Sequence, residues 1–209
     1  KEMEMGFERM WRRAQSKKLG IMRNEPSQNE FRYISNYPFP SKRHLYSEIV
    51  NAIRNAKSHI YITTPYFVPT RHLFKVLRSI AKRGVDIKII IPESSDHPIV
   101  DLCSRAFFTQ AFKSGIRIYL HKGEMIHNKT IIIDDEWSTI GTLNLDAASL
   151  LYNFEANIVS TNTLFSKELS VHFVQDLLKA EEVIPEQWQN RYWLEKFAGF
   201  FARLLRDFM

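Results

Sequence analysis

Short apolar segments and amphipathic helical segments alternate through the first half of this 209-residue chain. Leu45, Ile49 and Ile53 recur at helical spacing on one face. The run 59–64 is β-branched and aromatic, which favours a strand, and Pro65 ends it. An amphipathic helix beside a buried strand is the repeating unit of α/β proteins, so this alternation constrains the fold more than any other feature.

Two further pairs of helix and strand follow the first. Thr70 can cap a helix that ends at Gly84, and residues 86–91 are apolar enough for a fully buried strand. A helix over about 99–113 and a strand over 116–120 repeat this order. Strands joined through a helix lie parallel, with a right-handed crossover. The first of these helices is predicted to bury Leu73, Val76, Leu77 and Ile80.

The pattern changes after residue 120. Residues 129–134, 137–141 and 154–160 are typical of short strands with little helix between them, so the sheet must be mixed. A helix after Thr163 covers this sheet, and Pro185 marks another break. The predicted fold class is α/β, with a mixed, largely parallel central sheet flanked by helices on both faces. The covering helix is predicted to turn inward Leu164, Phe165, Leu169, Phe173, Leu177 and Leu178.

We divide the chain into three regions. Residues 1–40 are interpreted as the end of a preceding domain plus a linker, because residues 7–18 resemble the end of an amphipathic helix and residues 24–40 are polar and aperiodic. Residues 41–182 are the compact part. Residues 183–209 form a C-terminal amphipathic helical tail, which either lies at a lipid interface or packs internally.

Charge and cysteine content narrow the classes of function. The chain has 29 Lys and Arg against 23 Asp and Glu, a net charge of +6, which favours an anionic partner such as a phosphate group or an acidic lipid surface. Residues 1–24 hold +4 of this excess. Cys103 is the single cysteine of the chain, which excludes an internal disulfide and a thiolate zinc module. No segment reaches the roughly 18 to 20 apolar residues of a membrane span.

The segment 125–155 carries the candidate chemistry. Residues two apart in a strand share a face, so His127 and Lys129 are predicted to project the same way. An imidazole beside an ammonium suits attack on an anionic phosphodiester. Asp134 is seven positions from His127 and is predicted to point to the other face. We interpret Asp134 as a structural anchor that needs a partner.

Three further polar residues follow in the same segment. Thr142 and Asn144 are again two apart, and their hydroxyl and carboxamide can donate hydrogen bonds to phosphate oxygens. Glu155 supplies a carboxylate. A carboxylate that accepts from one imidazole nitrogen holds a neutral His127 in the tautomer that can attack through the other nitrogen.

These residues resemble the signature of the phospholipase D superfamily, H-x-K-x-x-x-x-D followed by a G-[ST]-x-N turn and a downstream Glu. The matching residues are His127, Lys129, Asp134, Gly141, Thr142, Asn144 and Glu155. Further blocks are similar to the second half of bacterial cardiolipin synthases: TPYFVP, RGVDIKIIIP, SDH, GIRIY, GTLNLD and NFE, in that order. The chain departs from that family at Asn128, where a small residue is usual, and at Ala148, where an Arg is usual.

The resemblance implies a phosphatidyltransferase that needs neither metal nor cofactor. In this family a phosphatidyl group moves between two phosphatidylglycerol molecules through a phosphohistidine, and glycerol is released. The implied catalytic residues are His127, Lys129, Asp134 and Glu155, with Lys129, Thr142 and Asn144 on the phosphate. The implied partners are phosphatidylglycerol and an anionic membrane surface, and the implied location is the bacterial inner membrane.

The superfamily builds one active site from two such motifs, and this chain holds one of them. None of the other six histidines has a Lys two residues later. We expect the second motif from an N-terminal half that precedes Lys1, or from a second copy of the chain. The alternative functions are a phosphodiesterase or nuclease that acts as a homodimer with one motif per chain, and a scaffold that binds anionic lipid without turnover. Nucleic acid is the less favoured partner, because no basic run is interleaved with stacking aromatics.

Overall fold

The computed structural model describes residues 30–123 and 125–189, and these residues form an eight-stranded sheet with the order β1-β9-β7-β6-β2-β4-β5-β10. Its strands are β1 (Phe31–Asn36), β2 (His59–Thr63), β4 (Asp86–Pro92), β5 (Arg117–His121), β6 (Thr130–Ile133), β7 (Trp137–Gly141), β9 (Glu155–Ser160) and β10 (Ala180–Glu182). A separate two-stranded sheet pairs β3 (Phe67–Val68) with β8 (Leu145–Asp146) in parallel.

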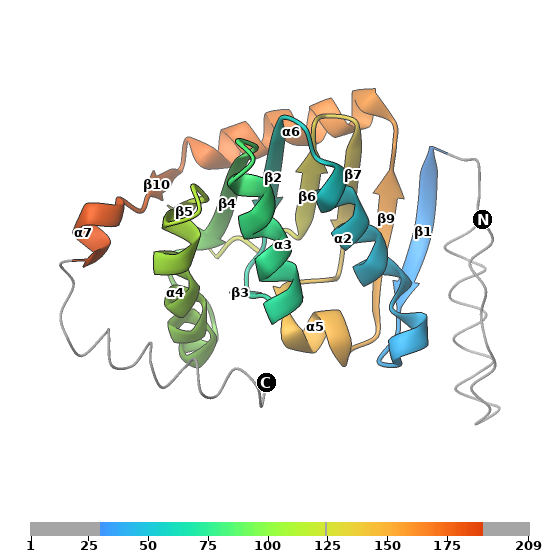
Figure 1. Cartoon of the computed structure of the whole chain (residues 1–209), viewed down its shortest axis with the longest axis horizontal. Coiled ribbons are helices and arrows are strands. Elements are labelled where there is room, and N and C mark those ends of the chain that lie inside the picture. Colours follow the sequence, from blue (N-terminus) through green and yellow to red (C-terminus); the bar gives the residue numbers. More distant parts are fainter. Residues whose placement is uncertain (1–29, 124, 190–209) are drawn as a thin grey trace.

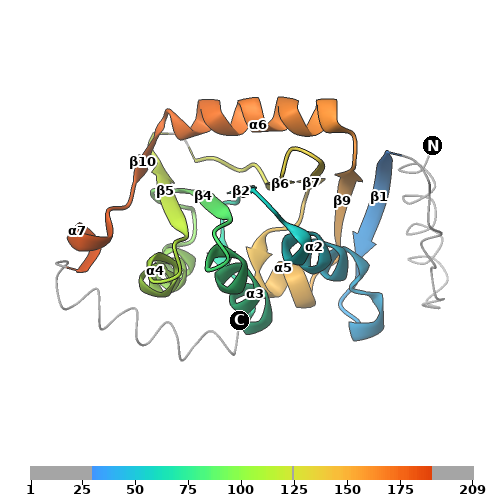
Figure 2. The same cartoon turned by 45° about the horizontal axis from the view of Figure 1, so that its top comes forward.

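Helices cover both faces of the large sheet (Figures 1 and 2). Four of them lie on one face: α2 (His44–Asn55), α3 (Arg71–Ala81), α4 (Pro98–Phe112) and α5 (Ala147–Leu151). The long helix α6 (Thr163–Leu177) crosses the other face. The 3₁₀ turn η1 (Pro40–Lys42) leads into α2, and α7 (Pro185–Gln189) packs beside α4. This arrangement confirms the predicted α/β class with helices on both faces.

The sheet is mixed, and its parallel part is narrower than predicted. β2 pairs with β4 and β4 with β5 in parallel, as the alternation of helix and strand indicated. The pairs β2–β6, β6–β7, β7–β9, β1–β9 and β5–β10 are antiparallel. Parallel pairing in this sheet therefore stops at β2. Beyond it, β6 and β7 are antiparallel because the turn between them is too short to contain a crossover helix.

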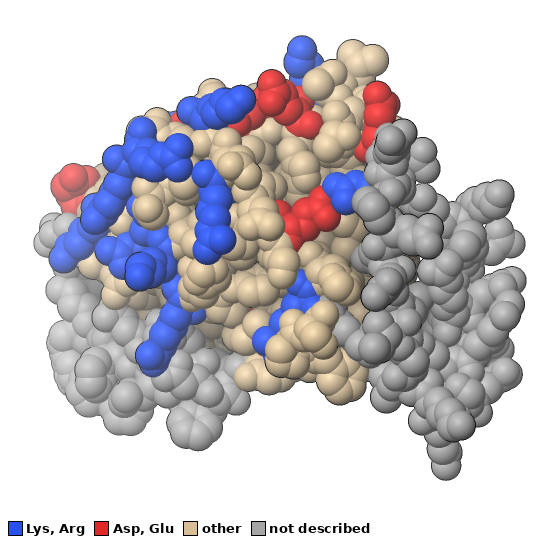
Figure 3. Space-filling view, turned by 45° about the vertical axis from the view of Figure 1, so that its right-hand side comes forward, with Lys and Arg blue, Asp and Glu red and all other residues tan. Residues whose placement is uncertain are grey.

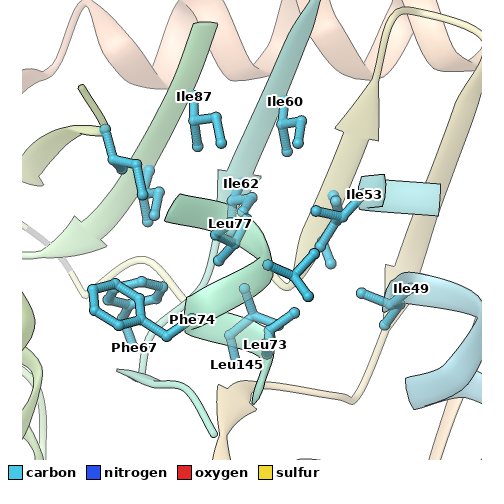
Figure 4. Close-up of a cluster of buried hydrophobic side chains, with 14 of the residues drawn as sticks. Ile49, Ile53, Ile60, Ile62, Phe67, Leu73, Phe74, Leu77, Ile87 and Leu145 are labelled. Atoms are coloured by element: carbon cyan, nitrogen blue, oxygen red, sulfur yellow. The ribbon is translucent and has the colours of Figure 1, made fainter. Parts of the chain in front are cut away.

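The core lies between α2, α3 and the central strands. The Thr70 hydroxyl caps α3 by accepting the N–H of Leu73 at 3.2 Å. Leu73 and Leu77 on this helix are fully buried with Ile62 of β2, as the periodicity predicts. Figure 4 shows these side chains meeting below the sheet. Burial of each such side chain contributes roughly 1.5–3 kcal/mol to the stability of the fold. This packed layer therefore keeps the strands that carry the site in a fixed position.

The interpretation of residues 24–40 as a linker is wrong for residues 31–36. These residues form β1, which pairs with the whole of β9 from Phe31 opposite Ser160 to Asn36 opposite Glu155. Asn36 is fully buried, and its amide donates to the carbonyl of Leu150 at 3.0 Å. That partner is 114 residues away, so the local polar pattern gave no indication that this segment is a buried strand. The sheet therefore begins before residue 41.

The predicted inward face of α6 is correct in its middle and wrong at its ends. Phe173 is buried, but Leu164 is 77% exposed and Leu178 is 84% exposed. Leu164 lies in the first turn and Leu178 is the C-cap, so both lie where the helix passes the edges of the sheet. The predicted helix at 7–18 and residues 190–209 of the predicted amphipathic tail lie outside the described residues.

Candidate active site

Several strands bring their polar ends to one edge of the sheet. Thr63 at the end of β2 lies opposite Thr130 at the start of β6 and beside Ile90 of β4. Gly141 at the end of β7 lies opposite Asn157 of β9. The segments that continue from these ends are 64–66, 93–97, 127–129 and 142–146, with Glu155 at the start of β9. The fold therefore gathers at one edge residues that lie up to about ninety positions apart in the chain.

His127 and Lys129 lie immediately before β6. The His127 side chain is exposed and Lys129 is half-buried. The Lys129 ammonium donates to the backbone carbonyl of His127 at 2.8 Å, and the Lys129 carbonyl accepts the N–H of Gly141 at 3.3 Å. Burial lowers the pKa of Lys129. The negative charges of Glu155 and then of Asp146 act in the opposite direction and raise it, but burial outweighs them. The site therefore holds a half-buried cation that is bonded to the backbone of a solvent-exposed histidine.

Thr142 and Glu155 form a hydrogen-bonded pair at the same edge. The Thr142 hydroxyl donates to the Glu155 carboxylate and accepts the N–H of Ala156 at 3.0 Å. A Cβ added at Gly141 would lie 2.4 Å from the carbonyl oxygen of Ala156, so this close approach requires glycine. The structure thus gives Glu155 a partner in Thr142, and its bond to the His127 ring stays a prediction.

Asn144 belongs to a second network that includes two residues the sequence reasoning missed. Its amide donates to the hydroxyl of Ser149 at 3.4 Å, which leaves a second N–H for a ligand. Among the residues that the structure describes, no donor reaches the buried Oδ1 of Asn144. Asp146 caps α5 by accepting the N–H of Ser149 at 2.7 Å, and burial raises its pKa despite that bond. The two-residue spacing of positions 142, 144 and 146 was the available signal.

Asp134 lies at the opposite end of β6 from Lys129. Its carboxylate accepts the backbone N–H groups of Lys57, Ser58 and His59 at 2.8, 2.8 and 2.9 Å. Burial alone would raise the pKa of Asp134, but these three bonds outweigh it and hold the pKa below its usual value. Asp134 therefore anchors the start of β2, as its structural interpretation predicts, and the structure does not bring it to the His127 end.

Tyr66 and Asp96 extend the site over the ends of β2 and β4. The Tyr66 hydroxyl donates to Asp96 Oδ1 at 2.6 Å. Thr64 ties this segment to β8, because its hydroxyl accepts the N–H of Leu145 at 3.3 Å and donates to the Tyr66 carbonyl at 3.0 Å. These residues belong to the TPYFVP and SDH blocks of the sequence.

Solved structures with known folds resemble this one. A phospholipase D family member, Nuc from Salmonella typhimurium, superposes with a TM-score of 0.60 at 24% identity, over 74% of this chain and 99% of that one. The phosphatidylserine synthase of Haemophilus influenzae Rd KW20 superposes with a TM-score of 0.64 at 15% identity, over 95% of this chain and 53% of that one. At these identities the likeness is one of fold.

Sequence comparison gives the narrower relationship. Cardiolipin synthase A of Pectobacterium carotovorum subsp. carotovorum (strain PC1) is 33% identical over 185 residues, which make up 87% of this chain and 38% of that protein. The chain therefore spans less than half the length of that curated relative. The family model described as cardiolipin synthase, PLD-like domain, matches residues 49–177, which include His127, Lys129 and Glu155. Because this match covers more than half of the chain, the chain belongs to the PLD-like domain family of the cardiolipin synthases.

Proposed function

We propose that this chain provides one half of the active site of a phosphatidyltransferase of the cardiolipin synthase type. The observation that carries the proposal is that the exposed His127, the Lys129 ammonium bonded to its carbonyl, and the Thr142–Glu155 pair lie at the ends of neighbouring strands. Family membership supports the reaction class, because the matched region contains all of these groups.

The reaction has two balanced displacements at phosphorus. A ring nitrogen of His127 forms a bond to the phosphorus of one phosphatidylglycerol, and the bond from phosphorus to the glycerol oxygen breaks. A general acid from the second motif protonates that oxygen, and glycerol leaves. The free hydroxyl of a second phosphatidylglycerol then attacks the phosphorus and loses its proton to the same group, while the bond to His127 breaks. His127 is regenerated and cardiolipin is formed.

Lys129 and Asn144 stabilise the charge that grows on the phosphate oxygens, whereas the Thr142 hydroxyl donates its single proton to Glu155 and holds that carboxylate in place. One N–H of the Lys129 ammonium donates to the His127 carbonyl, and the remaining ones can reach a phosphate. Such preformed donors lower the barrier because they need no reorganisation during the reaction. The lowered pKa of Lys129 reflects a partly desolvated cation, whose attraction to an anionic phosphodiester is correspondingly stronger.

The second motif comes either from another part of the same polypeptide or from a second copy of the chain. The relatives favour the same polypeptide, since each is more than twice the length of the region that matches. A homodimeric nuclease is the competing assignment, and the net charge of +6 suits it equally well. Product analysis separates the two, because a nuclease degrades nucleic acid and leaves phosphatidylglycerol intact.

Basic side chains favour contact with an anionic lipid surface. Residues 71–84, which include α3, contain Lys and Arg but no Asp or Glu. Figure 3 shows Lys and Arg gathered on the left side of one face of the molecule. Within the described residues, no helix is both long and apolar enough to cross a membrane. We propose that the protein reaches its substrate at a membrane surface, and binding to phosphatidylglycerol vesicles should fall as salt rises.

Labelled phosphatidylglycerol tests the proposed reaction. The complete protein should convert vesicles of this lipid into cardiolipin and glycerol in equal amounts, as resolved by mass. Rapid quenching should trap a phosphatidyl adduct on the peptide that contains His127, and His127→Gln should remove the adduct. Consumption of nucleic acid with no lipid product would overturn the proposal in favour of the nuclease.

A further inference from the structure

A tyrosine, a carboxylate and a histidine meet above the site, and the proposed chemistry leaves them without a task. Tyr66 follows β2, whereas Asp96 and His97 follow β4. Besides the 2.6 Å bond from Tyr66 to Asp96 Oδ1, the His97 Nε2 lies 3.7 Å from Asp96 Oδ2. The rings of Tyr66 and His97 are 5.7 Å apart. The three groups therefore form one cluster from two loops.

Hydrogen bonds fix the loop that carries Asp96. Asp101, in the first turn of α4, accepts the N–H of Ser95 at 2.9 Å and the hydroxyl of Ser95 at 2.7 Å. The Ser95 hydroxyl oxygen in turn accepts the N–H of His97 at 3.1 Å. On the other side, the pairing of Phe67 with Leu145 holds the Tyr66 segment against β8. The cluster is thus preorganised before any ligand binds.

The cluster faces the candidate active site and is open to solvent. Strand ends place it beside the segment 127–129, and the charge of Asp96 interacts with His127 and with Lys129. The side chains of Asp96 and His97 are 58% and 61% exposed. Asp134, by contrast, has both carboxylate oxygens bonded to backbone N–H groups at the start of β2. Asp96 bonds the Tyr66 hydroxyl and its own backbone N–H, and its exposed carboxylate can still accept hydrogen bonds from a ligand.

The chemistry of the cluster selects the kind of ligand. An ionised carboxylate accepts hydrogen bonds and donates none, and it repels a phosphate oxygen. The bond from Tyr66 first, and then the neighbouring His97, the backbone N–H of Asp96 itself and His127, lower the pKa of Asp96, so it is ionised at neutral pH. Burial and Asp96 raise the pKa of Tyr66 to about 12, so its phenol keeps its proton. The matching ligand is a neutral group with several hydroxyl donors.

We propose that Asp96, held by Tyr66 and flanked by His97, is the subsite that binds the glycerol headgroup of the acceptor lipid. This inference rests on the proposed function, and it names the group that the site recognises. The headgroup of phosphatidylglycerol has two adjacent hydroxyls. Asp96 accepts from the hydroxyl that does not react, and this contact directs the other hydroxyl toward the phosphorus on His127. Asp96 is therefore a positioning residue, and it takes no proton in the reaction.

Competition between two soluble acceptors tests the subsite. The complete protein receives phosphatidylglycerol vesicles together with isotope-labelled glycerol and 1-propanol, and mass spectrometry measures labelled phosphatidylglycerol against phosphatidylpropanol. Asp96→Asn should lower this product ratio at least about tenfold. The substitution weakens the contact with the second hydroxyl of glycerol, whereas 1-propanol has no second hydroxyl and makes no such contact. Tyr66→Phe should lower the ratio by a smaller factor and raise the KM for glycerol. Asp176→Asn on α6, across the sheet, is the matched control and should keep the wild-type ratio.

The possible outcomes separate the subsite from the proposed function. A wild-type protein that makes neither product overturns the proposed function and the subsite with it. An active wild type whose product ratio is unchanged within twofold in Asp96→Asn overturns the subsite alone. Equal loss of both products in Asp96→Asn also overturns it, since a group that serves diols must discriminate between the acceptors. Asp96→Ser is measured in parallel, with circular dichroism to verify folding, and should show the same fall in ratio.

Discussion

The two ends of β6 are built differently, although one sequence signature spans both. Before Thr130, Lys129 is half-buried, its ammonium carries N–H groups beyond the one that bonds the His127 carbonyl, and His127 is exposed. After Ile133, the Asp134 carboxylate is surrounded by three backbone donors within 2.9 Å. The Lys129 end therefore keeps hydrogen-bond donors that a ligand can use, whereas the hydrogen bonds of Asp134 join two strands of the fold.

This difference shows how one motif can combine chemistry with support. Asp134 joins the start of β2 to the end of β6, and these two strands carry Tyr66 and Lys129 at their other ends. Locking one end of the strand pair therefore fixes the register of the reacting groups at the other. Substitutions at the His127 end should change activity with little effect on stability, and substitutions at the Asp134 end should do the reverse.

The largest effect is expected at His127. His127→Ala in the complete protein should lower cardiolipin formation by about 10⁴-fold or more, as expected for loss of a nucleophile. The melting temperature should stay within about 1 °C of wild type, because truncation of an exposed side chain removes little packing. Lipid mass spectrometry and thermal denaturation measure the two quantities.

His72→Ala provides the matched control for this prediction. His72 is an exposed histidine of α3 whose ring contacts Arg54 at 3.1 Å, away from the strand ends that form the site. Its replacement should leave lipid turnover unchanged. If His127→Ala keeps lipid turnover within tenfold of wild type, the assignment of a catalytic role to the His127 end of β6 is contradicted.

Gly141 affects both catalytic activity and the stability of the fold, and its substitution should give the next largest effect. Gly141→Ala places a Cβ 2.4 Å from Ala156 O and 2.6 Å from Asn157 Cα, and neither backbone atom can move alone. We expect a loss of about 3 kcal/mol in the free energy of unfolding, at the upper end for overpacking. Activity should fall as well, because the clash displaces Thr142. Denaturant unfolding and lipid turnover of the same preparation test both expectations.

Gly84→Ala separates this clash from ordinary glycine strain. Gly84 has φ of +94°, and an added Cβ meets nothing within 4 Å. Its replacement should destabilise by only about 1 kcal/mol and should preserve activity. Equal losses in the two variants would contradict the close approach of β7 to β9 as the reason for glycine.

Local patterns predicted most of the fold, whereas distant pairing escaped them. The cap at Thr70 and the buried face of α3 depend on neighbouring residues, and both are confirmed. β1 depends on β9, more than a hundred positions away, and its buried Asn36 is polar. Hydrophobic periodicity does not predict a strand such as β1, which contains buried polar residues and pairs with a segment so far along the chain.

The site shows the same limit. Spacing within 125–155 predicted that Asp134 lies apart from His127 and Lys129, and the structure places it at the opposite end of β6. The shared orientation of the His127 and Lys129 side chains stays a prediction. Asp96 joins Tyr66 across thirty positions, through two strand ends that meet only in the folded sheet. A sequence motif identifies the residues at the centre of such a site more readily than those around it.

Asp134 should give a moderate loss of stability with activity preserved. Asp134→Ala leaves three backbone N–H groups without their acceptor, and we expect about 2 kcal/mol of destabilisation, since the groups are partly accessible to water. Lipid turnover at a temperature where the variant is folded should stay within tenfold of wild type. A loss of turnover of a thousandfold or more in a folded, stable variant would return Asp134 to the reacting set.

The smallest effect is expected in the pH dependence of the same carboxylate. The pKa of Asp134 is lower in the folded protein than the roughly 3.9 of an unfolded aspartate, so its charge stabilises the fold above that value. This contribution is lost as the pH falls through the folded pKa. Asp134→Asn keeps one oxygen acceptor, so the variant should be about 1 kcal/mol less stable than wild type at pH 7. The gap should shrink as the pH falls below about 4, because protonated aspartic acid and asparagine are then both neutral.

Urea unfolding of wild type and Asp134→Asn across this range isolates the effect. Other carboxylates with lowered pKa values, Asp86 and Asp96 among them, titrate in both proteins and cancel in the difference. Asp135→Asn is the neighbouring control, because Asp135 contacts the side chains of His59 and Ser170 and no backbone donor of β2. A gap between wild type and Asp134→Asn that persists unchanged below pH 3 would mean that the shape of the side chain, and not its charge, anchors this end of β6.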